Sequence, residues 1–172
     1  MKEKYLLSVL ADSSPGLLSR VIIMLTRRRI EMDSVNMAKT DINSVVLITI
    51  EIAINTNEIK QLQLQIEKII EVIKTDAVLC RSVVNQKLAF FKLSNNILEL
   101  PQGAVIQKYG AQIINLYPDA FVISKAGSET VISELYNKLE GKYLLGFAQT
   151  GMLVDSSLLD GNDEWRISRL AA

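Results

Sequence analysis

The sequence predicts an α+β fold made of two similar units in tandem, each with the element order βαββαβ. Two observations lead to this prediction. Aliphatic and β-branched residues gather in short runs typical of strands, and between them apolar residues recur every three or four positions, as on a buried helix face. The same alternation begins again after about residue 85. With 172 residues, 49% of them hydrophobic, the chain can bury a core in each unit.

The first strand and the first helix meet at a polar loop. Residues 4–11 alternate loosely and form the strand. Ser13 or Ser14 then caps a helix whose first position is Pro15, because proline lacks the amide hydrogen that would have no partner there. Apolar residues at helical spacing continue this helix to about Arg28.

Two strands follow the first helix. Residues 30–39 carry apolar side chains on alternate positions, but these positions change face near Asp33 and Ser34, which indicates a bulge or an edge strand. Residues 45–54 are rich in β-branched residues, so we expect a strand that is buried on both faces.

A second helix and a fourth strand complete the first unit. Caps are available at residues 55–57, and an apolar stripe of isoleucine and leucine then runs from Ile59 to Ile73. Residues 78–84 form the last strand, with Cys80 in its buried interior. The resulting order over about 85 residues is the ferredoxin-like arrangement.

The second unit is predicted to occupy residues 86–154, and a polar tail follows it over residues 155–172. The tail is expected to be frayed or to become ordered on a partner. The predicted elements of the second unit are a strand at 87–93, a short helix from Pro101 that ends at Gly110, a hairpin turn at Pro118 and Asp119, a helix capped by Ser128 and ended by Gly141, and a last strand at 144–154.

Composition argues against several classes of protein. The 19 basic and 19 acidic residues balance, whereas nucleic-acid binders carry a basic surface. Arg27, Arg28 and Arg29 cluster where a helix ends, and cations there complement the helix dipole. The chain has no histidine and no metal-ligand spacing, so we expect no catalysis and no bound metal. A single cysteine and the lack of a long apolar run favour a cytoplasmic protein without a disulfide.

The βαββαβ arrangement serves many functions, and the residues narrow them. An RNA-binding unit would need aromatic residues on its central strands, and residues 45–54 contain none. A phosphatase would need a loop that cradles phosphate next to an arginine, whereas Arg20 falls inside the first helix. A small-molecule sensor remains. Gly16 would leave the amides of the first helical turn open to a carboxylate, although a glycine after proline is also ordinary turn chemistry.

One family shares these features. The stretch LSVLADSSPGLLSRVIIMLTRRRIEMDSV, residues 7–35, resembles the opening of the regulatory small subunits of acetolactate synthase, also called acetohydroxyacid synthase. The stretches QIEKIIEVIK and GAQIINLY resemble later blocks, so the resemblance spans residues 4–154. It implies an ACT domain at 1–85, a smaller ferredoxin-like domain at 86–154, and a homodimer.

The resemblance also implies a function. Such a dimer binds and activates a separate catalytic subunit and relays feedback inhibition by valine or a related branched-chain amino acid. Thiamine diphosphate, magnesium and FAD belong to that catalytic subunit, and no cofactor is expected in this chain. We expect residues 86–172 to carry the contact with the catalytic subunit.

Transferred residue by residue, the family's effector site falls on the first loop of one chain and the second strand of its dimer mate. Relatives have asparagine where Ser13 and Glu31 stand, and a smaller residue where Leu17 stands. Glu31 could pair with the ammonium group of an effector, while Leu17 would occupy part of the space for its side chain. The expected effector-binding residues are Ser13, Ser14, Gly16, Leu17 and Leu18, with Glu31 and Met32 opposite.

Two alternatives remain open at this point. One is a stand-alone ACT-type amino-acid sensor that regulates some other enzyme. The other is a purely structural oligomerisation module without a ligand. Binding to a thiamine-diphosphate enzyme would separate the regulatory subunit from both, and calorimetry with amino acids would separate the two alternatives from each other.

Overall fold

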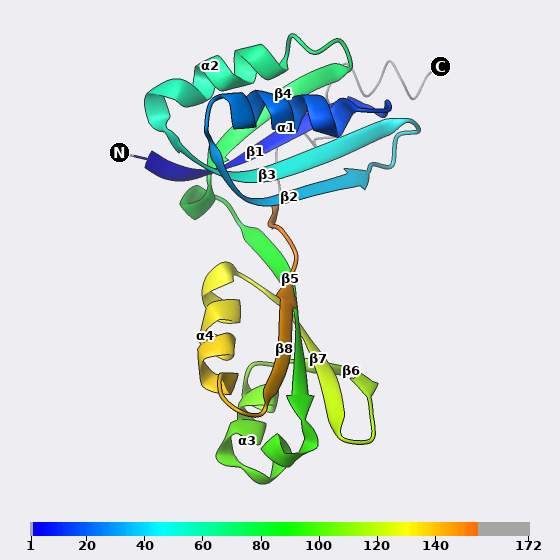
Figure 1. Cartoon of the computed structure of the whole chain (residues 1–172), viewed down its shortest axis with the longest axis vertical. Coiled ribbons are helices and arrows are strands. Elements are labelled where there is room, and N and C mark those ends of the chain that lie inside the picture. The colour runs from blue at the N-terminus through cyan, green and yellow to red at the C-terminus, as the bar shows by residue number, and fades with distance from the viewer. Residues whose placement is uncertain (1, 155–172) are drawn as a thin grey trace. The chain divides into compact units, whose positions relative to one another are not determined.

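The structure, a computed structural model, describes residues 2–154 (Figure 1). These residues form two compact units. The first contains residues 2–84 together with 151–154, and the second contains Asn85–Thr150. Each unit is an antiparallel sheet with two α-helices, so the predicted α+β class with βαββαβ units is confirmed.

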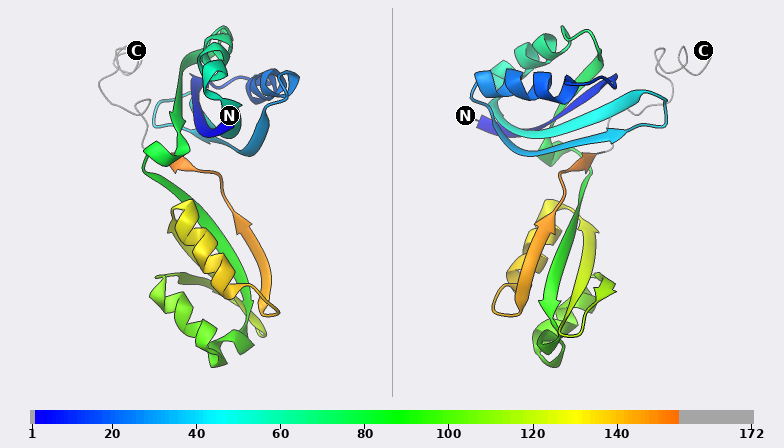
Figure 2. Two further views of the ribbon diagram at one scale, coloured as in Figure 1. Left: turned by 90° about the vertical axis from the view of Figure 1, so that its left-hand side faces the viewer. Right: turned by 45° about the vertical axis from the view of Figure 1, so that its right-hand side comes forward.

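The first unit has a four-stranded sheet in the order β2-β3-β1-β4, in which every neighbouring pair is antiparallel. Helices α1 and α2 cover one face of this sheet (Figure 2). In chain order the elements are β1 (Lys2–Asp12), α1 (Leu17–Arg27), β2 (Glu31–Lys39), β3 (Val45–Asn55), α2 (Thr56–Ile66) and β4 (Val72–Leu79).

The core of this unit lies between the sheet and the two helices. Successive strand residues point to opposite faces, so every second residue of β1 and β3 meets the apolar stripes of α1 and α2. Complete burial of one such aliphatic side chain stabilises the fold by roughly 1.5–3 kcal/mol. Strand β3 lies between two neighbours and is buried on both faces, as predicted. The residues at the centre of this core are Leu7, Val9, Leu17, Val21, Leu25, Ile48, Ile50 and Leu62.

A buried carboxylate holds the end of the described chain against the other face of this sheet. Glu51 of β3 is 2% exposed, and its Oε1 accepts a hydrogen bond from Ser34 Oγ (2.5 Å) and another from the Met152 amide (3.0 Å). Gly151 lies so close that a Cβ there would stand 2.8 Å from Ser34 Oγ. Residues 151–152 therefore belong to the first unit, although the sequence placed them in a strand of the second.

The second unit has strands in the order β6-β7-β5-β8, with α3 and α4 packed on one face around Phe91 and Phe121. Ser128 caps α4 as predicted, since its Oγ accepts a hydrogen bond from the Val131 amide. The elements are β5 (Asn85–Ser94), α3 (Pro101–Lys108), β6 (Gln112–Leu116), β7 (Ala120–Gly127), α4 (Glu129–Leu139) and β8 (Leu144–Gln149). The two-residue strand β9 (Leu153–Val154) lies among residues 151–154 of the first unit. Short 3₁₀ helices occupy Cys80–Ser82 and Asn95–Glu99.

Two expected element boundaries in the first unit were wrong. Helix α2 ends at Ile66 instead of Ile73, because the chain turns there through hydrogen bonds from the Ile69 amide to Ile66 and from the Val72 amide to Ile69. Ile70, which the helical stripe would have buried, is 98% exposed. The fourth strand consequently starts at Val72 and ends at Leu79.

Cys80 is the residue most affected by this shift. It lies in a half-buried 3₁₀ turn after β4 and not inside a buried strand. The bulge predicted in the second strand is confirmed, since the register of β2 against β3 shifts between Met32 and Ser34, and β2 is an edge strand of the sheet.

Candidate functional site

The loop between β1 and α1 has a left-handed glycine at its end. Gly16 is the N-cap of α1 with φ +79°, a conformation that L-residues with a side chain rarely adopt. The helix therefore begins at Leu17, and the expectation that a serine caps it with Pro15 at its first position was wrong. A Cβ at Gly16 would meet no atom within 4 Å, so the space beside it is open.

Several backbone amides at this helix start have no protein partner. The Leu17 amide donates to the Ser14 carbonyl at 3.3 Å, and the Ser13 amide donates to the Ser44 carbonyl at 2.7 Å. Among residues 2–154, no acceptor meets the amides of Gly16, Leu18 or Ser19. Free amides at the positive end of a helix dipole favour an anion such as a carboxylate.

Ser14 takes part in a different interaction from the expected cap. Its Oγ donates to Glu71 Oε1 (3.2 Å) and accepts from Arg20 Nη2 (3.0 Å), while Arg20 and Glu71 form an ion pair at 2.6 Å. A hydrogen bond from its own backbone amide, together with Arg20 and Ser14, holds the pKa of Glu71 below its ordinary value of 4.5. This network, which sequence reasoning missed, fastens the loop to the connection between α2 and β4.

A hollow of about 530 Å³ lies beside the same loop. Ser13 lines it together with residues 39–46, the connection from β2 to β3. Its walls carry hydroxyl and amide groups, including those of Thr40, Asn43 and Ser44. The volume lies within the range of sites that bind small molecules.

The other expected site residues do not all face this loop. Leu17 is fully buried in the core, so only its backbone borders the loop. Glu31 and Met32 begin β2, opposite Ala53 and Ile52 of β3. That end of the sheet holds the start of β1, whereas the loop follows the end of β1. Within one chain, the structure therefore does not bring Glu31 and Met32 to Gly16.

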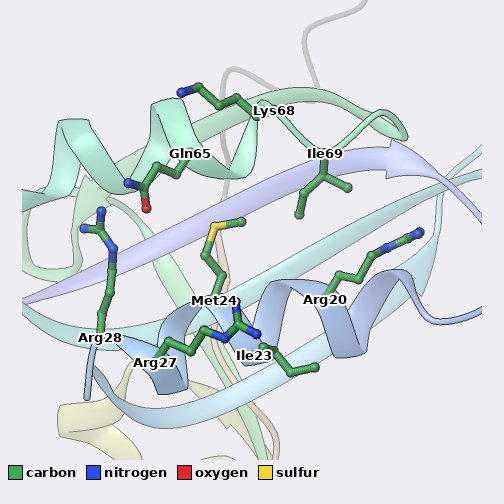
Figure 3. A pocket seen from close by; sticks show the side chains of 8 residues that line it. All are labelled: Arg20, Ile23, Met24, Arg27, Arg28, Gln65, Lys68 and Ile69. Carbon is green, nitrogen blue, oxygen red and sulfur yellow. The ribbon is translucent and has the colours of Figure 1, made fainter.

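A second hollow, of about 700 Å³, lies between the two helices of the first unit. Figure 3 shows Met24 rising from α1 into the gap, Ile69 reaching toward it from beyond α2, and Arg20 and Arg28 toward opposite ends. We call this hollow the α1–α2 groove. Its lining comprises Arg20, Ile23, Met24, Arg27, Arg28, Gln65, Lys68 and Ile69.

Within residues 2–154, no group of three or more histidine, cysteine, aspartate or glutamate side chains could hold a metal ion. No helix of that part of the chain has both the length and the apolar character needed to cross a membrane.

Comparison with known proteins decides what this first unit is. Residues 13–75 match the sequence model of the ACT domain family, a segment that runs from the loop through α1, β2, β3 and α2 into β4. This segment is similar to ACT domains. The expected effector-binding residues all lie within it.

The resemblance to acetolactate synthase small subunits is also confirmed, and it extends beyond the ACT domain. The chain is 27% identical to the acetolactate synthase small subunit of Mycobacterium avium over 139 residues, which cover 80% of this chain and 83% of that protein. It is 24% identical to the acetolactate synthase small subunit of Bacillus subtilis over 150 residues, or 86% of this chain and 87% of that protein.

The fold agrees over the same length. The crystal structure of the acetolactate synthase small subunit from Thermotoga maritima superposes with a TM-score of 0.81 at 19% identity, covering 89% of this chain and 96% of that one. The folds of both units of this chain are therefore present in that structure.

Proposed function

We propose that this chain is the non-catalytic regulatory small subunit of an acetolactate synthase, which binds and activates a separate catalytic subunit. One observation carries this proposal: the similarity to proteins of that name covers most of both chains and includes the unit that follows the ACT domain. Thiamine diphosphate, magnesium and FAD would then reside in the catalytic subunit.

A stand-alone ACT-type sensor for another enzyme is the alternative. An ACT domain by itself would fit either reading, because a fold does not determine a function. The second unit favours the regulatory subunit, since the match to the acetolactate synthase small subunit of Bacillus subtilis covers 86% of this chain and therefore extends well beyond residues 13–75.

We further propose that two copies pair through the outer edge of β2 and that an amino-acid effector binds between them. Strand β2 ends the sheet, and Val35 and Met37 on it are 39% and 38% exposed. In an antiparallel pairing of two β2 strands, the partner's Glu31 lies near Lys39 of this chain. Lys39 lines the same hollow as Ser13. The twofold axis of such a dimer would thus bring the partner's Glu31 close to the loop between β1 and α1, whereas Glu31 of the same chain lies far from that loop.

The effector's carboxylate would bind the free amides at Gly16 and Leu18, and its ammonium group the partner's Glu31. Hydrogen bonds to a charged group contribute roughly 1.5–3 kcal/mol each. Such an effector inhibits only if it binds one arrangement of the complex more tightly than the other.

The experiment is an assay of acetolactate formation by the catalytic chain of the same organism, with and without this protein and with and without valine. We expect the rate to rise when this protein is added. A catalytic chain that neither binds this protein nor responds to it would contradict the proposal. A rise in rate without any response to valine, leucine or isoleucine would contradict only the effector.

A further inference from the structure

The α1–α2 groove combines apolar side chains with several cationic ones. Its apolar floor consists of Ile23, Met24 and Ile69, and Ile23 remains 49% exposed although it lies on an amphipathic helix. Four cationic side chains surround that floor, and no acidic residue lines it.

Most of these cations have no acidic partner. Arg20 pairs with Glu71, but within residues 2–154 Arg27, Arg28 and Lys68 form no ion pair or side-chain hydrogen bond. The dipole of α1 accounts for arginines in its last turn. Lys68 follows the C-terminus of α2, whose dipole favours a cation in the same way. The two helix ends thereby bring Arg27, Arg28 and Lys68 to one hollow.

The nearby acidic side chain is already engaged. Glu67 accepts a hydrogen bond from the Thr75 hydroxyl at 2.7 Å, on the far side of the connection to β4. Three like charges around one apolar hollow repel each other unless an anion joins them, and the described residues supply none. A negatively charged ligand would complement these three side chains.

We propose that the α1–α2 groove docks an acidic, aliphatic segment of the catalytic subunit. This inference rests on the proposed function. An aliphatic side chain of that segment covers Met24 and Ile69, and its carboxylates pair with Arg27, Arg28 and Lys68. Recognition of an amphipathic segment in a groove between helices uses both kinds of contact, and complementary charge raises the rate of association. The contact lies on the ACT domain, in addition to the one expected in residues 86–172.

Arg20 connects this docking site to the loop between β1 and α1. The same guanidinium lines the groove, pairs with Glu71 and donates to Ser14. A carboxylate of the docked segment that competes for Arg20 would loosen the loop that presents Gly16.

The test measures the affinity of full-length protein for the full-length catalytic chain at low and at moderate salt. The groove variant carries Arg27→Glu, Arg28→Glu and Lys68→Glu. Its control carries Lys2→Glu, Lys4→Glu and Lys60→Glu, which change the net charge equally at exposed lysines of the first unit that do not line the groove. Circular dichroism and thermal unfolding verify that both variants fold, as expected for surface substitutions.

We expect the groove variant to bind at least about tenfold more weakly at low salt and to lose most of its salt dependence, while the control changes by less than about threefold. Ile23→Gln, which keeps the charge, should weaken binding without changing the salt dependence. Equal binding by groove variant and control overturns the inference and leaves the proposed function intact. Equal binding accompanied by loss of tripolyphosphate binding in calorimetry overturns it in favour of a small anion. If the wild-type protein binds no catalytic chain, both proposals fall.

Discussion

Gly16 combines a required backbone conformation with an open approach to free amides. Its φ of +79° costs an alanine roughly 1–2 kcal/mol, because a Cβ is disfavoured in the left-handed region. Asparagine tolerates that region better than alanine does. No atom lies within 4 Å of the Cβ position, so strain and steric exclusion can be separated by substitution.

We expect Gly16→Ala to lower the free energy of unfolding by about 1 kcal/mol in denaturant titrations, and Gly16→Asn to lower it less. Gly146→Ala is the control, because its Cβ would make only an ordinary contact, at 3.7 Å from Lys92 Cβ. In the complex with the catalytic chain, Gly16→Asn should reduce the response to the effector despite its better stability, because its side chain stands before the amides. An undiminished response in this variant would show that Gly16 serves the turn alone.

At the scale of elements, Glu71 fastens the start of α1 to the start of β4. Its pKa lies lower in the folded chain than in the unfolded chain, through a hydrogen bond from its own amide and the proximity of Arg20 and Ser14. A lowered pKa means that the ionised carboxylate stabilises the fold at pH values above 4.5. That contribution disappears as the pH falls through the folded-state pKa.

Glu71→Gln should therefore lower the denaturant midpoint at neutral pH, and the difference from the wild type should vanish in acid. The effect is expected to be small, because this ion pair is solvent-exposed. Glu140→Gln, at an exposed side chain of the second unit, should leave the midpoint unchanged. A difference between Glu71→Gln and the wild type that stays constant across the pH range would contradict the assigned role of the ion pair.

The elements with a clear hydrophobic period were predictable from sequence, and the connections were not. Strand β3 was predictable because its β-branched run has no competing helical pattern, and the bulge in β2 because its apolar positions change face. The end of α2 was not predictable, because the isoleucines at positions 66, 69, 70 and 73 have the spacing of a continued helical stripe. Ile66 ends the helix, Ile69 and Ile70 lie in the turn, and only Ile73 belongs to the strand that starts at Val72.

Only the part of the candidate site that lies in the loop between β1 and α1 was predictable from sequence. Gly16 and the amides around it follow from the sequence, because proline, glycine and an apolar helix mark the turn. The Arg20–Glu71 ion pair joins residues that lie 51 positions apart, and no local sequence pattern predicts this pairing. The Glu51–Met152 contact spans 101 positions and places residues 151–152 in the first unit, against the sequence period. The tail at 155–172 lies outside the described residues.

At the scale of the whole molecule, one chain carries only half of the proposed effector site. The loop with Gly16 follows the end of β1, while Glu31 pairs with Ala53 at the opposite end of the sheet. Edge strands that expose apolar side chains pair readily with another strand. A second copy joined at β2, as proposed above, would complete the site.

Disrupting this edge should therefore remove the dimer and the effector response together. We expect Val35→Lys with Met37→Lys to raise the dimer dissociation constant at least about tenfold, because the two lysines at position 35 then face each other across the twofold and the apolar contact of both side chains is lost. Tenfold corresponds to about 1.4 kcal/mol. Sedimentation equilibrium measures the constant. Leu98→Lys, at a side chain of the second unit that is 57% exposed, is the control and should not change it. Both side chains on β2 are more than a third exposed in the single chain, so the lysines should not unfold it. A variant that is monomeric yet still responds to an amino acid would place the effector within one chain and contradict the shared site.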